Sequence, residues 1–332
     1  MLVARSPLRI SLGGGGTDLA SYYENYEGFL ISAAINKYVF VSINTPFKDG
    51  IFLKYSKIEG CKSLEEINHP IIREALRLLN VNKKIEISSF ADIPAGTGLG
   101  SSGSFTVALL KCLHTYLRKP LDIKELAELA CHLEIDILKE PIGKQDQYIA
   151  SYGGVNCFSF KKNNDVIIEP LKISQDILYE LEDNLLLFFT GYTRKASQAL
   201  LEQKSKTTKK DKDMTENLHF VKGLGLESKD AFEKDDLNRF GQIMNLHWEY
   251  KKKRYNGMSN TIIDQCYEFA IQNGAVGGKL VGAGGGGFLM FYANNPKKLR
   301  TAMKGKGLTE VRFNFEKEGT KIVLGWHLCI QL

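Results

Sequence analysis

The sequence has few cysteines, and no two of them are close together. Six cysteines are scattered along 332 residues, and none forms a CxxC pair. Their spacing argues against a zinc site held by thiolates and against a redox dithiol. Several are surrounded by apolar residues, so we expect buried, reduced thiols that pack as small hydrophobic side chains.

Long hydrophobic runs are absent as well. The N-terminal segment loses its apolar character at Arg5 and Arg9, and no apolar run elsewhere is long enough to span a bilayer. The sequence therefore predicts a cytoplasmic protein that does not bind a membrane.

The sequence also lacks a block of basic residues. The 44 Lys and Arg residues exceed the 38 Asp and Glu residues and give a formal net charge of +6, but they are spread along the chain. There is neither a base-stacking motif nor a zinc-ligand spacing of the kind that nucleic-acid-binding domains use. We expect the anionic partner to be a phosphorylated small molecule and not nucleic acid, and a homo-oligomer is compatible with the sequence.

The remaining composition is that of a folded enzyme. With 43% hydrophobic residues among 332, the chain is long enough for two domains that share an interface. Apolar segments predict strands over residues 2–10, 38–43, 85–90, 153–160, 166–171 and 185–189. Helical spacing predicts one helix after a glycine-rich stretch, up to about Arg118, and a second from Asp122, which can form a capping box with Glu125.

The second half of the chain has a different pattern, beyond a boundary that we place between Pro170 and Asp183. Helical sequence comes first, and strands are then expected over residues 279–281, 288–292, 309–315 and 322–327, with a short helix from about Pro296. This order favours an α+β domain with helices on one face of an antiparallel sheet. The basic run 204–212 is expected to be a solvated loop or helix end, and a lid over the substrate is the alternative.

The most informative motif is the glycine-rich segment Pro94-Ala-Gly-Thr-Gly-Leu-Gly-Ser-Ser-Gly-Ser104, between a predicted strand and a predicted helix. Glycines let the backbone approach a ligand closely, and the first N–H groups of a helix attract phosphate. Hydroxyl groups next to them can contact phosphate oxygens or Mg²⁺. The candidate residues for nucleotide binding are Pro94, Gly96, Gly98, Leu99, Gly100, Ser101, Ser102, Gly103 and Ser104.

Other nucleotide-binding motifs fit poorly. Gly98, Gly100 and Gly103 have the spacing of a dinucleotide fingerprint, but no acidic residue ends a following strand at the expected distance. A Walker A loop needs Gly-Lys-Ser/Thr, which neither 143–145 nor 278–280 supplies, and there is no His-Arg-Asp loop of a protein kinase.

Two further glycine motifs accompany this loop. Pro7-Leu-Arg-Ile-Ser-Leu-Gly-Gly-Gly-Gly-Thr-Asp18 follows the first predicted strand, and Lys279-Leu-Val-Gly-Ala-Gly-Gly-Gly-Gly287 precedes a late one. In this order the three motifs resemble those of the GHMP kinases, which include galactokinase, homoserine kinase and mevalonate kinase. The resemblance spans nearly the whole chain.

The resemblance implies a fold of the α+β class, the GHMP kinase fold. A ribosomal-S5-like N-terminal domain would comprise residues 1–175 and a ferredoxin-like C-terminal domain residues 176–332, with the active site between them. ATP phosphates would lie on the loop 96–104, with Mg²⁺ beside them. Gly284, Gly285 and Gly286 would support that loop or the substrate, and a tight turn between strands is the alternative for them.

The resemblance also assigns roles to individual side chains. Asp146 matches the aspartate that sugar kinases of the family use as catalytic base or to orient the substrate, and Arg9 matches the arginine that stabilises it. Glu134 lies beside the apolar stripe of its helix, so its carboxylate needs a cation or hydrogen-bond donors. The resemblance gives the Mg²⁺ ion to Glu134 and Ser102, and an ion pair of Glu134 with a Lys or Arg is the alternative.

The sugar site is expected at the first motif. The carboxylate of Asp18 can accept two vicinal hydroxyls, and Thr17 with the backbone of Gly14, Gly15 and Gly16 would shape the pocket. Galactokinase carries an acidic residue and a histidine in place of Gly15 and Gly16, which argues against galactose.

Within the family, the resemblance is greatest to the D-glycero-D-manno-heptose 7-phosphate kinases. It implies transfer of the ATP γ-phosphate to the anomeric oxygen, which gives the 1,7-bisphosphate on the route to GDP-heptose and surface polysaccharide. L-fucokinase is the alternative enzyme, and a GHMP-fold sugar sensor without turnover is the alternative of another class. For the phosphate of a sugar phosphate, the candidate cations are Lys144, Arg194 and Lys195, each of which can instead be a solvated side chain or an ATP contact.

Overall fold

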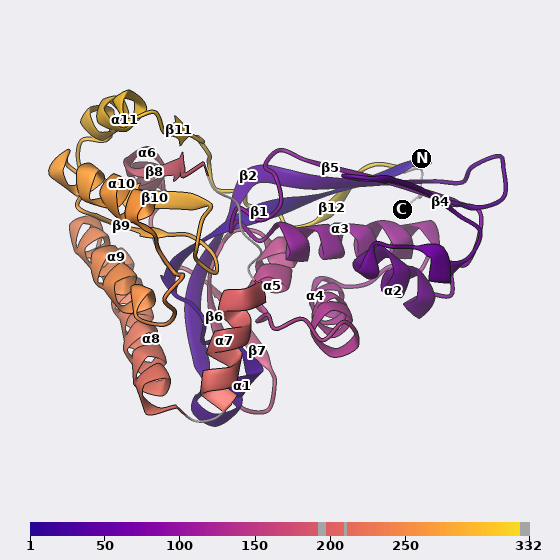
Figure 1. Ribbon diagram of the computed structural model, residues 1–332, viewed down its shortest axis with the longest axis horizontal. Helices are drawn as coiled ribbons and strands as arrows, with labels where there is room; N and C mark the ends of the chain where they lie inside the picture. The colour runs from indigo at the N-terminus through magenta and orange to yellow at the C-terminus, as the bar shows by residue number, and fades with distance from the viewer. Residues whose placement is uncertain (192–196, 209–210, 326–332) are drawn as a thin grey trace.

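The computed structural model describes residues 1–191, 197–208 and 211–325, whose strands form two sheets (Figure 1). The larger sheet has the order β12-β1-β2-β5-β3-β4, and β6 and β7 are added through β2. Its strands are β1 (Leu2–Gly14), β2 (Gly28–Asn44), β3 (Ile51–Lys54), β4 (Ile58–Cys61), β5 (Ile85–Ala91), β6 (Val155–Phe160), β7 (Val166–Pro170) and β12 (Lys321–Leu324). The smaller sheet has the order β11-β8-β10-β9.

Helices cover the sheets. They are α1 (Ala20–Tyr26), α2 (Pro70–Leu78), α3 (Ser101–Tyr116), α4 (Ile123–Cys131), α5 (Gln145–Tyr152), α6 (Gln175–Asn184), α7 (Ser197–Thr208), α8 (Lys212–Glu233), α9 (Leu237–Lys252), α10 (Thr261–Gln272) and α11 (Pro296–Gly305), with the short turns η1 (Leu64–Glu66) and η2 (His132–Ile137). In Figure 1, α2, α3 and α4 lie along one face of the larger sheet, and α9 to α11 lie with the smaller sheet at the other end of the molecule.

The long antiparallel pair of β1 and β2 changes its burial pattern along its length. Leu2 to Arg5 alternate between buried and partly exposed, whereas residues 28–35 of β2 and most of their β1 partners are buried continuously. Helices α3 and α5 pack on the pair, and α8, from the second half of the chain, packs on it as well and contacts Gly13, Gly14 and Phe29. The first motif therefore lies where the two halves of the chain meet.

The capping box at the start of α4 is confirmed. The backbone N–H of Glu125 donates to Asp122 Oδ1 at 2.7 Å, and the backbone N–H of Asp122 donates to Glu125 Oε2 at 3.1 Å. The expected helix then continues from α4 into η2, a single π-helical turn that carries Glu134. Such wide turns occur often at functional sites, because they displace a side chain from the regular helical register.

The smaller sheet is antiparallel, as expected, and consists of β8 (Leu185–Phe189), β9 (Gly277–Leu280), β10 (Phe288–Tyr292) and β11 (Thr309–Glu310). Two expectations about its end are wrong. Only residues 309–310 of the predicted strand 309–315 are β-strand, and the last predicted strand joins β1 of the larger sheet, with Ala4 paired to Ile322. The chain crosses between the sheets beside β2, where Glu316 N–H donates to Ala34 O at 2.9 Å. The domain division at residue 175 stays a prediction.

Other expectations concern single segments. Cys61, Cys112, Cys131, Cys157 and Cys266 are buried and free, and Cys329 lies outside the described residues. Residues 204–208 of the basic run form the end of α7, so the prediction of a helix end is confirmed for this part. In the described part of the chain, no helix combines the length and the apolar character that crossing a membrane requires.

Candidate active site

A cleft of about 880 Å³ contains residues from all three glycine motifs. Its walls are built from β1 and β5, the N-termini of α3 and α5, and the residues around α9 and β9. This volume suits a small-molecule site that holds two ligands side by side.

The second and third motifs touch each other through glycines. Gly98 and Gly282 both have positive φ, at +85° and +80°, and a Cβ on Gly98 would lie 2.5 Å from the carbonyl oxygen of Val281. A Cβ on Gly282 would lie 2.4 Å from the Cα of Gly98. The contact therefore needs glycine on both sides. Val281 and Gly282 line the cleft, whereas Gly284, Gly285 and Gly286 are not among its lining residues, and their role as substrate ligands stays a prediction.

The predicted nucleotide loop divides into lining and anchoring residues. Pro94, Gly96, Gly98, Gly100, Ser101, Ser102 and Gly103 line the cleft. Leu99 and Ser104 are buried behind it and tie the loop to β1, because Leu99 O accepts from the backbone N–H of Arg9 at 3.0 Å and Ser104 Oγ donates to Pro7 O at 2.7 Å. Gly100 caps α3 with φ +78°, so the free N–H groups of the first turn face the cleft.

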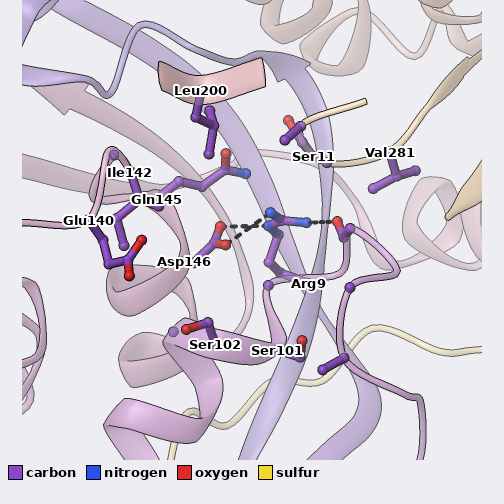
Figure 2. A pocket seen from close by; sticks show the side chains of 18 of the residues that line it. Arg9, Ser11, Ser101, Ser102, Glu140, Ile142, Gln145, Asp146, Leu200 and Val281 are labelled. Carbon is purple, nitrogen blue, oxygen red and sulfur yellow. Dashed lines mark hydrogen bonds and ion pairs between the residues drawn. The ribbon is translucent and has the colours of Figure 1, made fainter. Parts of the chain in front are cut away.

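Arg9 and Asp146 form a two-pronged ion pair at the centre of the cleft (Figure 2). Arg9 Nε donates to Asp146 Oδ1 at 2.8 Å, Nη2 donates to Oδ2 at 3.0 Å, and Nη1 donates to Gly98 O. Asp146 lies in the first turn of α5, and the side chain of Arg9 is 9% exposed. A bidentate contact of this kind fixes the orientation of the carboxylate as well as its position.

The glycines of the loop make room for this pair. A Cβ on Gly103 would lie 2.7 Å from Asp146 Cβ, and a Cβ on Gly100 would lie 3.0 Å from Arg9 Cγ. Asp146 therefore rests directly against the N-terminal turn of α3, where a bound phosphate would also lie. The sequence predicted both residues, and the structure brings them together with the loop.

Glu134 is almost fully buried, at 1% exposure, and lies behind Ser102. Ser102 Oγ donates to Glu134 Oε2 at 2.8 Å and Gln147 Nε2 donates to Oε1 at 2.9 Å. Burial raises the pKa of Glu134, and these hydrogen bonds oppose the rise. Both of these hydrogen-bond partners are neutral side chains, and neither is a Lys or Arg.

The carboxylate and hydroxyl of this pair fit a Mg²⁺ ion. Both Glu134 and Ser102 line the cleft beside the N-terminus of α3. No group of three or more His, Cys, Asp or Glu side chains arranged for a metal occurs in the described part of the chain. Mg²⁺ in kinases usually takes only one or two carboxylates and completes its shell with substrate phosphates and water, so the donor set is sufficient.

The predicted sugar-site residues are only partly on the cleft. Gly15, Gly16 and Asp18 line it; Asp18 is buried, which raises the pKa of its carboxyl, and accepts the backbone N–H of Gln145 at 3.2 Å. The Thr17 hydroxyl instead donates to Phe29 O at 2.9 Å and does not line the cleft.

The predicted phosphate ligands are placed differently. The ammonium group of Lys144 donates to Asn164 Oδ1 at 2.6 Å and to Asn164 O at 3.0 Å, and Lys144 is not among the lining residues. Its side chain thus stabilises the turn before β7, and its role as a substrate ligand stays a prediction. Arg194 and Lys195 lie outside the described residues.

The sequence analysis did not propose three basic residues that line the cleft as ligands. Lys251 and Arg254, at the end of α9, and Lys279, on β9, are buried and line the cleft together with His247. A signal existed in the basic run Lys251-Lys-Lys-Arg254, which ends α9 and continues into the turn after it. Nothing in the sequence, however, showed that Lys251 and Arg254 are buried.

Comparison with known proteins gives a consistent result. The sequence matches the GHMP kinases N terminal domain over residues 69–154 and the GHMP kinases C terminal domain over residues 228–307. It is 32% identical to the D-glycero-alpha-D-manno-heptose 7-phosphate kinase of Campylobacter jejuni, over 96% of this chain and 97% of that protein. It is 26% identical to the bifunctional fucokinase/GDP-fucose pyrophosphorylase of Arabidopsis thaliana, over 98% of this chain and 32% of that protein.

A solved structure agrees in fold. The crystal structure of a D-glycero-D-manno-heptose 1-phosphate kinase from Bacteroides thetaiotaomicron superimposes with a TM-score of 0.80 at 27% identity, and the match covers 98% of this chain and 100% of that one. The expected α+β fold of this family is thereby confirmed. From the two matched domains and the full-length relative it follows that the chain belongs to the GHMP kinase family and is a phosphotransferase with a hydroxyl group as acceptor.

Proposed function

We propose that this protein is an ATP- and Mg²⁺-dependent kinase that phosphorylates the anomeric hydroxyl of D-glycero-D-manno-heptose 7-phosphate and forms the 1,7-bisphosphate. The observation that carries the reaction type is the carboxylate of Asp146, which Arg9 holds against the N-terminus of α3. The choice of a heptose phosphate is supported by the Campylobacter relative, which is 32% identical.

The two ends of the cleft suit the two substrates. Beyond the α3 loop, its walls include the aromatic and aliphatic side chains of Tyr55, Ile71, Phe90 and Phe105, which suit a purine base. On the other side of the Arg9–Asp146 pair the walls are polar. Glycine backbone, Asp18 and the buried hydroxyl of Ser11, which has no hydrogen-bond partner among the described residues, suit the hydroxyl groups of a sugar.

The chain's own residues would act in the following way. The N–H groups at the start of α3 bind and orient the nucleotide phosphates, and Asp146 accepts the proton of the attacking hydroxyl. Arg9 keeps that carboxylate in place and stabilises negative charge on the transferred group. Glu134 and Ser102 would hold Mg²⁺, which when bound neutralises charge on the nucleotide phosphates.

Product analysis with a panel of acceptors tests the proposal. We expect selective ATP consumption with D-glycero-D-manno-heptose 7-phosphate, compared with the unphosphorylated heptose, L-fucose, galactose and mannose, and a new anomeric phosphate in the ³¹P NMR spectrum. Preference for L-fucose would instead assign a fucokinase, in line with the 26% identical relative. ATP binding without turnover of any sugar would identify a sensor.

The Mg²⁺ requirement tests the role of Glu134. Glu134→Gln keeps the shape of the side chain but removes the charge, so we expect the Mg²⁺ concentration for half-maximal activity to rise by about 10-fold or more. Magnesium titrations of initial rate at saturating ATP measure it. Glu128→Gln, an exposed carboxylate on α4 that pairs with Lys124, is the control and should leave the titration unchanged. An unaltered Mg²⁺ requirement in Glu134→Gln would show that this carboxylate is purely structural.

A further inference from the structure

Three buried cations lie together on one wall of the cleft. Lys251, Arg254 and Lys279 are 8%, 5% and 2% exposed, and all three line the cleft. Lys251 lies in the last turn of α9, Arg254 in the turn that follows it, and Lys279 on β9, which packs against α9. His247, one turn before Lys251, lines the same wall.

None of these cations has an anionic partner among the described residues. Lys251 Nζ donates to Leu280 O at 2.8 Å and to Gly282 O. Lys279 Nζ donates to Leu12 O at 3.1 Å and lies 3.3 Å from Nδ1 of the neutral His247. These bonds use only part of the donors of each ammonium group, and all the acceptors are neutral.

The guanidinium group of Arg254 is placed similarly. Arg254 Nε donates to Asn217 Oδ1 at 2.8 Å and Nη2 donates to Gly15 O at 3.3 Å. Asp18 is the carboxylate whose charge acts on Arg254, but the two side chains form no ion pair. Donors of the guanidinium group therefore remain for a ligand.

Such an arrangement is costly for the empty protein. Burial lowers the pKa of Arg254 to about 10. Burial, together with repulsion by neighbouring cations, lowers the pKa of Lys279 to about 7 and that of Lys251 well below its usual range. His247 is likewise held neutral, because burial and the neighbouring cations lower its pKa. Because a buried charge without a partner destabilises a protein, such a cluster of cations indicates a site that an anionic ligand completes.

The position of the cluster indicates which ligand it serves. Figure 2 shows Ser101 and Ser102 on one side of the Arg9–Asp146 pair and Gln145 and Leu200 on the other. Arg254 belongs to the second side, because it binds Gly15 O. The next carbonyl in that loop, of Gly16, accepts from Gln203 Nε2 of α7 at 2.9 Å. Arg254 thus borders the acceptor side of the cleft, and Lys279 lies beside the same first motif, since its Nζ donates to Leu12 O. Lys251 donates to Gly282 O and so lies between this side and the contact of Gly282 with Gly98.

We propose that Lys251, Arg254 and Lys279 bind the phosphate that the sugar acceptor already carries, at the end remote from the hydroxyl that is phosphorylated. This inference rests on the proposed function as a kinase of a phosphorylated sugar, but not on which phosphorylated sugar is the acceptor. The cluster would make the enzyme select anionic, phosphorylated sugars, because a neutral sugar leaves the three cations without a partner.

Steady-state kinetics of variants test the subsite. In Lys251→Met and Arg254→Gln we expect the KM for D-glycero-D-manno-heptose 7-phosphate to rise about 10- to 100-fold, with the KM for ATP unchanged, since each variant loses charged hydrogen bonds to phosphate. The matched control is Lys252→Met on the same helix, whose side chain is 32% exposed and pairs with Glu249. It should leave both KM values unchanged. A rise in the KM for ATP alone would assign the cluster to the nucleotide and overturn the proposal.

A binding measurement separates this inference from the proposed function. Without ATP, heptose 7-phosphate should raise the Tm of the wild-type protein more than unphosphorylated D-glycero-D-manno-heptose does, and the difference should disappear in both variants. Equal effects of the two sugars on the wild type, or a difference that persists in the variants, would overturn the subsite even if the kinase reaction is confirmed. Absence of turnover with the phosphate-dependent Tm shift intact would overturn the proposed function and leave the subsite standing.

Discussion

Asp146→Asn is expected to lower kcat by about 10²- to 10⁴-fold while ATP binding persists, the range usual for loss of a general base. Asparagine has the same shape as aspartate, so it can stay against the α3 turn, where a Cβ on Gly103 would lie 2.7 Å from Asp146 Cβ. It cannot take up the proton of the attacking hydroxyl. Single-turnover rates with heptose 7-phosphate, together with calorimetric titration of ATP, separate the chemical step from nucleotide binding.

The control for this variant is another aspartate of the same region. Asp136→Asn changes a side chain that is 62% exposed, pairs with His132 and does not line the cleft. It should retain the wild-type rate. If Asp146→Asn turned over at a rate close to that of the wild type, Asp146 would only orient the substrate and the hydroxyl proton would leave by another route.

Gly98→Ala is expected to destabilise the protein and to raise the KM for ATP by about 10-fold or more. Alanine at φ +85° is strained, and its Cβ would lie 2.5 Å from Val281 O, closer than contact distance. The strain and the overlap together are expected to cost about 2–5 kcal/mol in free energy of unfolding. Thermal unfolding and ATP titration measure the two effects.

The matched control is Gly223→Ala in the middle of α8. A Cβ there would have no neighbour within 4 Å, and the backbone is helical. We expect this variant to be more stable by about 0.5–1 kcal/mol, because alanine favours the helix, and to bind ATP normally. If Gly98→Ala unfolded at the temperature of the wild type and bound ATP equally well, the contact between the second and third motifs would neither stabilise the protein nor position the nucleotide loop.

Both predictions concern the meeting of three segments that are far apart in the sequence. Arg9 Nη1 donates to Gly98 O, and the same loop residue rests on Val281 O. The nucleotide loop is therefore held from β1 on one side and from the residue after β9 on the other. A change at this contact alters the orientation of Asp146 and the loop together, since Arg9 binds both.

The sequence by itself determined the features that depend on neighbouring residues. The capping box at Asp122, the glycine loop before α3 and most strands follow from local hydrogen bonding, backbone freedom and apolar periodicity. The family resemblance then supplied Arg9, Asp146 and Glu134, all of which line the cleft. These features could be predicted from the sequence because each depends on a short segment of the chain.

Only the tertiary structure decided which side chains face the cleft. Lys144 stands next to the motif of Asp146, but its ammonium group binds Asn164, whereas Lys251 and Lys279 come from separate segments to one buried wall. Tertiary packing also decided that the last strand crosses back to pair with β1. The identity of a basic or apolar residue does not show whether its side chain is solvated or buried. Its surroundings are set by the packing of segments far apart in the chain, and no local pattern records that packing.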